Sequence, residues 1–181
     1  MTDKEIDMTK RRGLFAFAFI LLGFGTIMPA FAQSGDGEER PSQDYVSKAA
    51  IGDMFEIQSS KLALRKAGDA NVKRFASQMV KDHTASSGKL KSIIKAEELP
   101  LVLPTKLDDT HQQMIDSLSA VSGGDFDRMY HEIQLKAHEE ALALHQAYAQ
   151  NGIEPKLKAF AGKTSKVVET HLGMLKAMHS M

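Results

Sequence analysis

Two long helical segments of this chain each carry a histidine in the middle of an apolar stripe. The stripe along residues 70–97 is formed by Val72, Ala76, Met79, His83, Ser86, Leu90 and Ile93. The stripe along residues 155–178 is formed by Leu157, Ala161, Thr164, Val168, His171, Leu175 and Met178. Alternating spacings of three and four residues put such side chains on one helical face. A core-facing imidazole needs a polar partner, because burial without one costs about 1–3 kcal/mol. The pattern therefore predicts a helical bundle with an internal polar layer.

The first 32 residues have the organisation of an export signal. Basic residues at positions 10–12 precede an apolar run over residues 13–28, and Ala30-Phe31-Ala32 forms a small-x-small cleavage motif. This series predicts a signal peptide over residues 1–32 that is cleaved after Ala32, with export of the remainder to the periplasm. The alternative is an N-terminal membrane anchor, although the apolar run is shorter than the roughly 20 residues that span a bilayer.

The rest of the chain, residues 33–181, has the length of one domain with a sizeable core. Four of the 23 basic and three of the 23 acidic residues lie in the first 32, so the remainder has a net charge near −1. It contains no basic block, and nucleic acid is therefore not an expected partner. Cysteine is absent, so a metal site would have to use His, Asp, Glu or Met.

Turn and cap residues divide the chain into helical segments. We expect a flexible polar linker over residues 33–43 and a bundle over residues 44–180. A first helix starts at Ser42 or Asp44 and ends near Ala67, and a second runs from about residue 70 to 97. Pro100 and Pro104 predict an extended crossover. A third helical region over residues 108–150 is interrupted near Gly123-Gly124 and restarts after Asp125, and a fourth follows Pro155.

Short sequence similarities relate the two halves of the chain. Residues 62–67 resemble residues 142–147, and after a turn residues 72–76 resemble residues 157–161. Two similar helical hairpins joined by a long crossover are typical of the ferritin-like arrangement. The predicted fold is therefore an all-α, ferritin-like four-helix bundle.

Each predicted hairpin places two polar side chains at the same height. Glu56 lies about 12 residues before the first turn and His83 about 14 after it, a difference of only ~3 Å along the axis. His138 lies about 15 residues before the second turn and His171 about 18 after it, within roughly 4 Å. On the third helix, His138 is expected at the shoulder of the buried face. The four residues form one candidate layer with a member from every helix.

This layer is a candidate metal site. Three imidazoles and one carboxylate could hold one divalent transition metal ion, Zn²⁺, Cu²⁺ or Fe²⁺, and Asp53 and Asp82 are nearby carboxylates. Di-iron bundles need Glu-x-x-His on two helices, whereas Val80, Leu135 and Val168 stand three residues before the histidines. That absence disfavours a metal-dependent redox enzyme, which stays a second alternative. The first alternative is a structural or partner-binding bundle whose polar layer holds water, with Asp82 as an ordinary flanking charge.

Two other groups of residues are weaker candidates. His131, His138 and His145 recur every seven residues and could form a surface metal stripe, although such stripes are usually solvated. Thioethers select Cu(I), which makes the C-terminal group of Met174, Met178, His179 and Met181 a further candidate. Methionine more commonly fills gaps in a core.

Several segments together resemble a known family of exported bacterial proteins. They are residues 45–46, 52–56, 72–76, 79–83, 122–127, 157–161 and 171–172, with Tyr130 and His138. In this combination the chain resembles domain of unknown function 4142, a family grouped with ferritin-like bundles and often labelled as outer-membrane proteins. The resemblance covers residues 44–178 and implies the fold and export, but no established activity. Asp53 departs from it, because the family pattern has glycine there.

The residues and the resemblance together predict an exported periplasmic bundle that binds a ligand or acts in a stress response. We expect a peripheral association with the cell envelope, and an enzymatic activity is not the favoured interpretation. Neither the metal nor the oligomeric state follows from the sequence.

Overall fold

The computed structural model describes residues 36–179, with the side chains of residues 41–178. The predicted signal peptide and its cleavage site lie outside the described residues. Within that range the secondary structure consists of helices without strands. The five helices are α1 (Asp36–Lys66), α2 (Ala70–Ala96), α3 (Asp109–Ala120), α4 (Gly123–Asn151) and α5 (Pro155–His179). The all-α prediction is therefore confirmed.

The first hairpin, α1 and α2, turns where the sequence has its first break. Gly68 follows the end of α1, and the Asp69 carboxylate accepts a hydrogen bond from the Asn71 amide at 2.6 Å. This is the N-cap that the sequence predicts, and it satisfies one of the free amides of the first turn of α2.

The second hairpin, α4 and α5, turns at the second break. The Gly152 amide donates to the Tyr148 carbonyl at 2.8 Å and so closes α4. Pro155 is the first residue of α5, where its missing N–H costs nothing. Gly152 also lies against the Tyr148 ring, since a Cβ there would come within 2.6 Å of Tyr148 Cε1.

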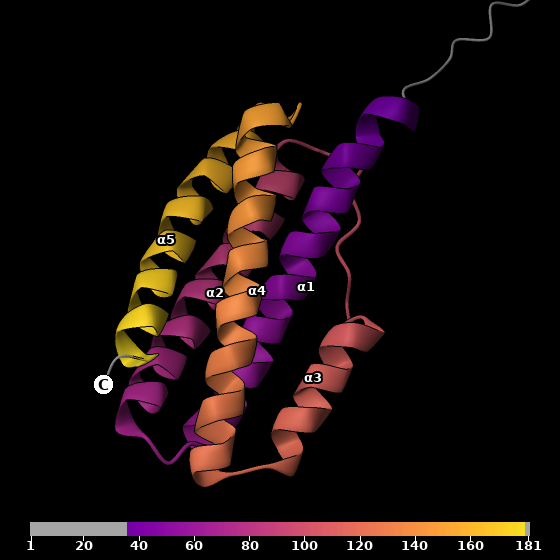
Figure 1. Cartoon of the computed structure of the whole chain (residues 1–181). Helices are drawn as coiled ribbons and strands as arrows, with labels where there is room; N and C mark the ends of the chain where they lie inside the picture. Colours follow the sequence, from indigo (N-terminus) through magenta and orange to yellow (C-terminus); the bar gives the residue numbers. More distant parts are fainter. Residues whose placement is uncertain (1–35, 180–181) are drawn as a thin grey trace, which may run out of the picture. The chain divides into compact units, whose positions relative to one another are not determined.

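The two hairpins pack into a four-helix bundle. Besides the pairs within each hairpin, α1 packs against α4 and α2 packs against α5. The crossover after α2 runs along the outside of the bundle, so that α2 and α4 point in the same direction (Figure 1). Every pair of neighbouring long helices is consequently antiparallel, as in the predicted ferritin-like arrangement.

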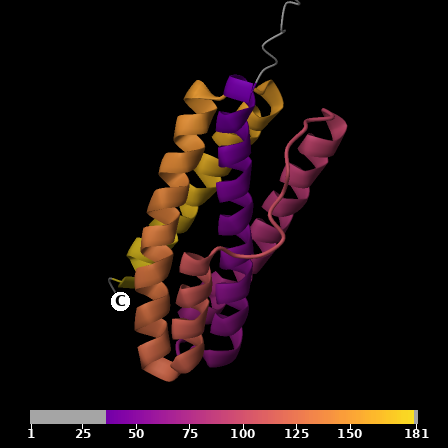
Figure 2. The same cartoon turned by 90° about the vertical axis from the view of Figure 1, so that its right-hand side faces the viewer.

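The interruption predicted near Gly123-Gly124 is a reversal of direction. Helix α3 packs beside α1 and α4 and runs opposite to α4, as Figures 1 and 2 show. Ser122 is extended, and Gly123 has a φ of 61°, a left-handed conformation that favours glycine. Helix α4 thus begins at Gly123 and not after Asp125. The sequence pattern could not show the reversal, because both segments have helical periodicity.

The start of α1 corrects the predicted linker. The helix begins at Asp36, so residues 36–43 are helical and the linker over residues 33–43 is wrong for that stretch. Tertiary contacts hold the end of this stretch: Ser42 is buried and its hydroxyl lies 2.7 Å from Tyr148 Oη, while the Gln43 amide pairs with the backbone of Val102. These contacts stabilise polar helical turns that lack an apolar stripe.

Apolar clusters lie on both sides of the middle of the bundle. One contains Tyr45, Val46, Leu90, Leu157 and Phe160, towards the end where α4 meets α5. The other contains Val72, Phe75, Met79, Phe126, Tyr130 and Leu175, towards the end where α1 meets α2. The residues between them along each helix include the predicted polar layer, which is thus held between two well-packed regions.

In the part of the chain that the structure describes, none of the helices is both long and apolar enough to cross a bilayer.

Candidate metal centre

The four residues of the predicted layer are all buried and come from four different helices. The exposed fractions are 4% for Glu56 on α1, 8% for His83 on α2, 1% for His138 on α4 and 2% for His171 on α5. The expectation that His83 and His171 face the core at a shared level is confirmed, because their ring centroids are 5.7 Å apart.

The three imidazoles form a nearly equilateral triangle. His138 lies 5.8 Å from His83 and 5.4 Å from His171 between ring centroids. One nitrogen of each ring lies within 4.8 Å of a nitrogen of both others. Within residues 36–179, the histidine and carboxylate side chains whose spacing fits a metal site are these three histidines. Phe75 packs against the triangle, 6.0 Å from His138 and 6.4 Å from His171.

Each ring uses one nitrogen for a hydrogen bond to an oxygen that can only accept. His83 Nδ1 donates to Asp53 Oδ1 at 2.8 Å, and His171 Nε2 donates to Asp82 Oδ2 at 2.9 Å. His138 Nδ1 donates to the Gln134 carbonyl at 2.9 Å. These bonds set the tautomers, because the proton must be on the donating nitrogen.

The opposite nitrogen of each ring has no hydrogen-bond partner among the described residues. These buried atoms are His83 Nε2, His138 Nε2 and His171 Nδ1. In a neutral imidazole each of them carries a lone pair. Histidines that ligate metals commonly donate their other N–H to a carboxylate or a carbonyl, and all three rings follow this pattern.

Glu56 belongs to the layer but stands beside the triangle. Its Oε1 lies 3.7 Å from His138 Nδ1, and its Oε2 is buried without a partner among the described residues. The structure therefore brings the three histidines together as one group of donor atoms, with Glu56 as an adjacent carboxylate.

The pKa values in this layer reflect burial and mutual charge. Burial, followed by the charges of His83 and His171, lowers the pKa of His138 to about 3. Burial also lowers the pKa of His171, against the opposing effect of Asp82. For His83, burial is outweighed by Asp53, Glu56 and Asp82, so its pKa is raised. Burial raises the pKa of Glu56 to about 7. The layer thus favours at most one imidazolium, and it resists a full set of positive charges.

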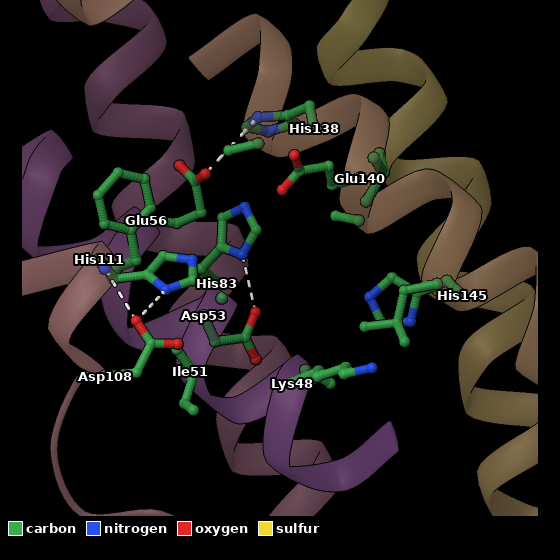
Figure 3. A pocket seen from close by; sticks show the side chains of 17 residues that line it. Lys48, Ile51, Asp53, Glu56, His83, Asp108, His111, His138, Glu140 and His145 are labelled. Atoms are coloured by element: carbon green, nitrogen blue, oxygen red, sulfur yellow. Dashed lines mark hydrogen bonds and ion pairs between the residues drawn. The ribbon is translucent and has the colours of Figure 1, made fainter. Parts of the chain in front are cut away.

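A cavity of about 400 Å³ reaches the layer from between α1 and α4. His83, His138 and Glu56 lie at its inner end, and Lys48, Asp108 and Glu140 are exposed residues on its lining (Figure 3). Small residues, Ala49, Gly52, Ala137 and Ala141, form part of its walls. His171 is not part of this lining and completes the triangle from α5.

The structure corrects two interpretations of α4. Gln134, His138 and His145 all lie in the core, so His138 is central and not at the shoulder of the buried face. A surface metal stripe of His131, His138 and His145 is therefore wrong. His145 instead pairs with Tyr45 Oη at 3.0 Å, and His131 Nε2 bonds to the Leu175 carbonyl at 2.9 Å. Because α4 contains several alanines, hydrophobicity alone does not define the edge of its buried face.

Other predicted residues have more specific positions than the sequence indicated. Asp53 and Asp82 hold histidine rings, so Asp82 is not an ordinary flanking charge. In the C-terminal Met/His group, Met174 is exposed and Met178 packs on a core cluster. The side chains of residues 179 and 181 lie outside the described part.

Gln134 is a further buried polar residue beside the layer. It is fully buried, and its side-chain amide donates to Ser59 Oγ at 3.2 Å. A signal was available, because Gln134 stands one helical turn before His138 on the same face.

The fold and the site define a class: a four-helix bundle with an inward-facing triad of histidines. A family model for Domain of unknown function (DUF4142) matches residues 28–178, and the chain belongs to that family. Comparison with curated proteins gives no significant match.

Solved structures of low sequence identity share the fold. A DUF305 protein from Streptomyces coelicolor is 12% identical, with a TM-score of 0.64 over 76% of this chain and 91% of that one. CopM in the Cu(II)-bound form is 16% identical, with a TM-score of 0.64 over 76% and 95%. CopM in the Cu(I)-bound form is also 16% identical, with a TM-score of 0.63 over 76% and 94%.

Proposed function

We propose that this protein is an exported metal-binding protein that holds one divalent transition metal ion on His83, His138 and His171. The observation that carries the proposal is a set of three buried imidazole nitrogens that have no hydrogen-bond partner among the described residues, in rings whose other nitrogens are already engaged. Glu56 places a carboxyl group beside the triad, with Oε1 3.7 Å from His138 Nδ1, and is a candidate for a fourth ligand.

Buried polar atoms such as these need a partner. Each unsatisfied buried polar atom costs about 1–3 kcal/mol, so the three nitrogens and Glu56 Oε2 together would cost about 4–12 kcal/mol. That is comparable to the whole stability of a domain, about 5–15 kcal/mol. One metal ion would satisfy the three nitrogens together. The competing interpretation is a layer of ordered water molecules, which makes a different forecast for added metal.

The donor set favours a borderline metal ion. Imidazole nitrogen suits Cu²⁺ and Zn²⁺, and Cu²⁺ binds most tightly among the divalent ions of the first row. Ligand nitrogens at about 2.0–2.1 Å from one ion lie about 3–4 Å apart, so the triad requires only a small inward shift. The similar fold of CopM, solved with copper and with silver, supports copper as the first metal to test.

The test is metal titration of the tag-free mature protein. We expect one Cu²⁺ per chain, with an electron paramagnetic resonance spectrum that shows coupling to nitrogen ligands. His171→Ala should abolish this high-affinity binding, and His131→Ala is the matched control on another bundle histidine. Absence of stoichiometric binding of Cu²⁺, Zn²⁺ and Fe²⁺ to the wild type would leave the water-filled layer as the explanation.

Export is the second part of the proposal and rests on the predicted signal over residues 1–32. We expect the mature protein in the periplasmic fraction to begin at Gln33, as determined by N-terminal sequencing. Recovery of an intact N-terminus in the membrane fraction would instead support the anchor.

A further inference from the structure

We infer that the cavity between α1 and α4 is the route by which the metal ion reaches and leaves the histidine triad. This inference rests on the proposed metal site and adds a function for the cavity. The lining combines exposed residues with the buried side chains of His83, His138 and Glu56, each of which has a side-chain atom without a hydrogen-bond partner among the described residues.

The size of the cavity fits a hydrated ion. A water molecule takes about 30 Å³ of liquid volume, so an ion with six waters needs about 180 Å³. The cavity measures about 400 Å³ and can therefore hold an ion before it exchanges water for imidazole. Apolar core clusters lie on either side of the layer along the bundle axis.

The charge of the lining favours a cation. Asp53, Asp108 and Glu140 line the cavity together with Glu56, whose pKa of about 7 leaves it partly protonated near neutral pH. Among the described residues, Lys48 is the one lysine or arginine of that lining. A cleft whose walls carry mostly one sign of charge concentrates ions of the opposite sign and raises their association rate. Figure 3 shows Asp108 and Glu140 on different sides of the cavity.

Gly52 gives a direct way to close the route. It lies on the cavity lining in α1, and a Cβ added there meets no atom within 4 Å. Gly52→Leu should therefore place its side chain in the cavity without a backbone clash. Gly88→Leu is the matched control, because Gly88 is also an open helical glycine but does not line the cavity.

The experiment measures uptake and release of Cu²⁺ by the mature protein. The chain has three tyrosines and no tryptophan, so stopped-flow quenching of tyrosine fluorescence reports uptake, and excess EDTA triggers release. A narrowed route should slow both rate constants about tenfold in Gly52→Leu and leave Kd within about twofold, since Kd is their ratio. Gly88→Leu should behave as the wild type. Circular dichroism checks that both variants keep their helix content.

A second variant tests the electrostatic part independently of packing. Glu140→Gln should slow uptake about twofold at low ionic strength, and this effect should disappear at high salt. Glu139→Gln is the control, because Glu139 is not part of the lining, and its uptake rate should equal that of the wild type. Wild-type-like rates for both Gly52→Leu and Glu140→Gln would reject the route and leave the metal site standing. Failure of the wild type to take up any metal would instead reject the proposed function and the route together.

Discussion

Replacement of Asp53 by asparagine is the most informative single change at the triad. The carboxylate is 5% exposed, accepts from His83 Nδ1 at 2.8 Å and accepts from Ser87 Oγ at 3.2 Å. Asp53→Asn keeps the volume and an acceptor oxygen, but it removes the negative charge that makes the His83 ring a stronger ligand. The variant therefore leaves every proposed ligand in place and perturbs one of them indirectly.

The expected magnitude follows from the linkage of binding to stability. Loss of such a partner typically weakens metal affinity 10–100-fold, which corresponds to about 1.4–2.7 kcal/mol. At a free metal concentration of about one hundred times the wild-type Kd, the wild type gains about 2.7 kcal/mol. A variant with about thirtyfold weaker binding gains only about 0.9 kcal/mol under the same conditions. At about 3 °C per kcal/mol for a domain of this size, the Tm shifts are about 8 °C and 3 °C.

The assay is thermal unfolding followed by circular dichroism, with and without Cu²⁺. Asp125→Asn is the control, because Asp125 is an exposed carboxylate paired with Arg128 and should leave the metal-induced shift unchanged. An equal metal-induced shift in Asp53→Asn and the wild type would refute the role assigned to the Asp53 carboxylate. No shift in the wild type itself would refute the metal centre.

Two further predictions concern the metal-free protein. Between pH 6.5 and pH 4.5 it should lose stability as the pH falls, with a slope that rises to about 1.4 kcal/mol per pH unit near pH 5, as measured by urea unfolding. The folded pKa values of His138 and His145, about 3 and 4, lie below the unfolded pKa of about 6.5. The stability that these two neutral histidines contribute is therefore present above the unfolded pKa and is lost as the pH falls below it. The pKa of Glu56 is raised to about 7, so Glu56 is protonated in the folded state and offsets about one of the protons that the unfolded histidines bind. A stability that stays constant or rises as the pH falls would contradict these pKa shifts. Separately, Gly152→Ala should destabilise the fold by about 1–3 kcal/mol, because its Cβ would meet the Tyr148 ring at 2.6 Å, and an unchanged Tm would show that the turn adapts.

The sequence by itself determined the helical class, the two hairpins and the layer. Helical periodicity reports which residues face the core, and the caps and breaks at Asp69 and Gly152 report where the chain turns. Together they predict the height of a residue in the bundle. They therefore predict that Glu56, His83, His138 and His171 lie at one level. The resemblance to the family covered almost the same residues as the match over residues 28–178.

Only the tertiary structure decided the direction of each side chain and the partners it meets. The reversal between α3 and α4 depends on one left-handed glycine, Gly123, and helical periodicity contains no information about it. The Asp53–His83 and Asp82–His171 pairs join neighbouring helices, so they depend on helix rotation and on rotamers. The position of Glu56 beside the histidine triangle also depends on helix rotation and on rotamers, which move side-chain atoms by a few ångströms. Chemistry at a metal centre depends on that scale, whereas a sequence pattern defines position only to about a helical turn.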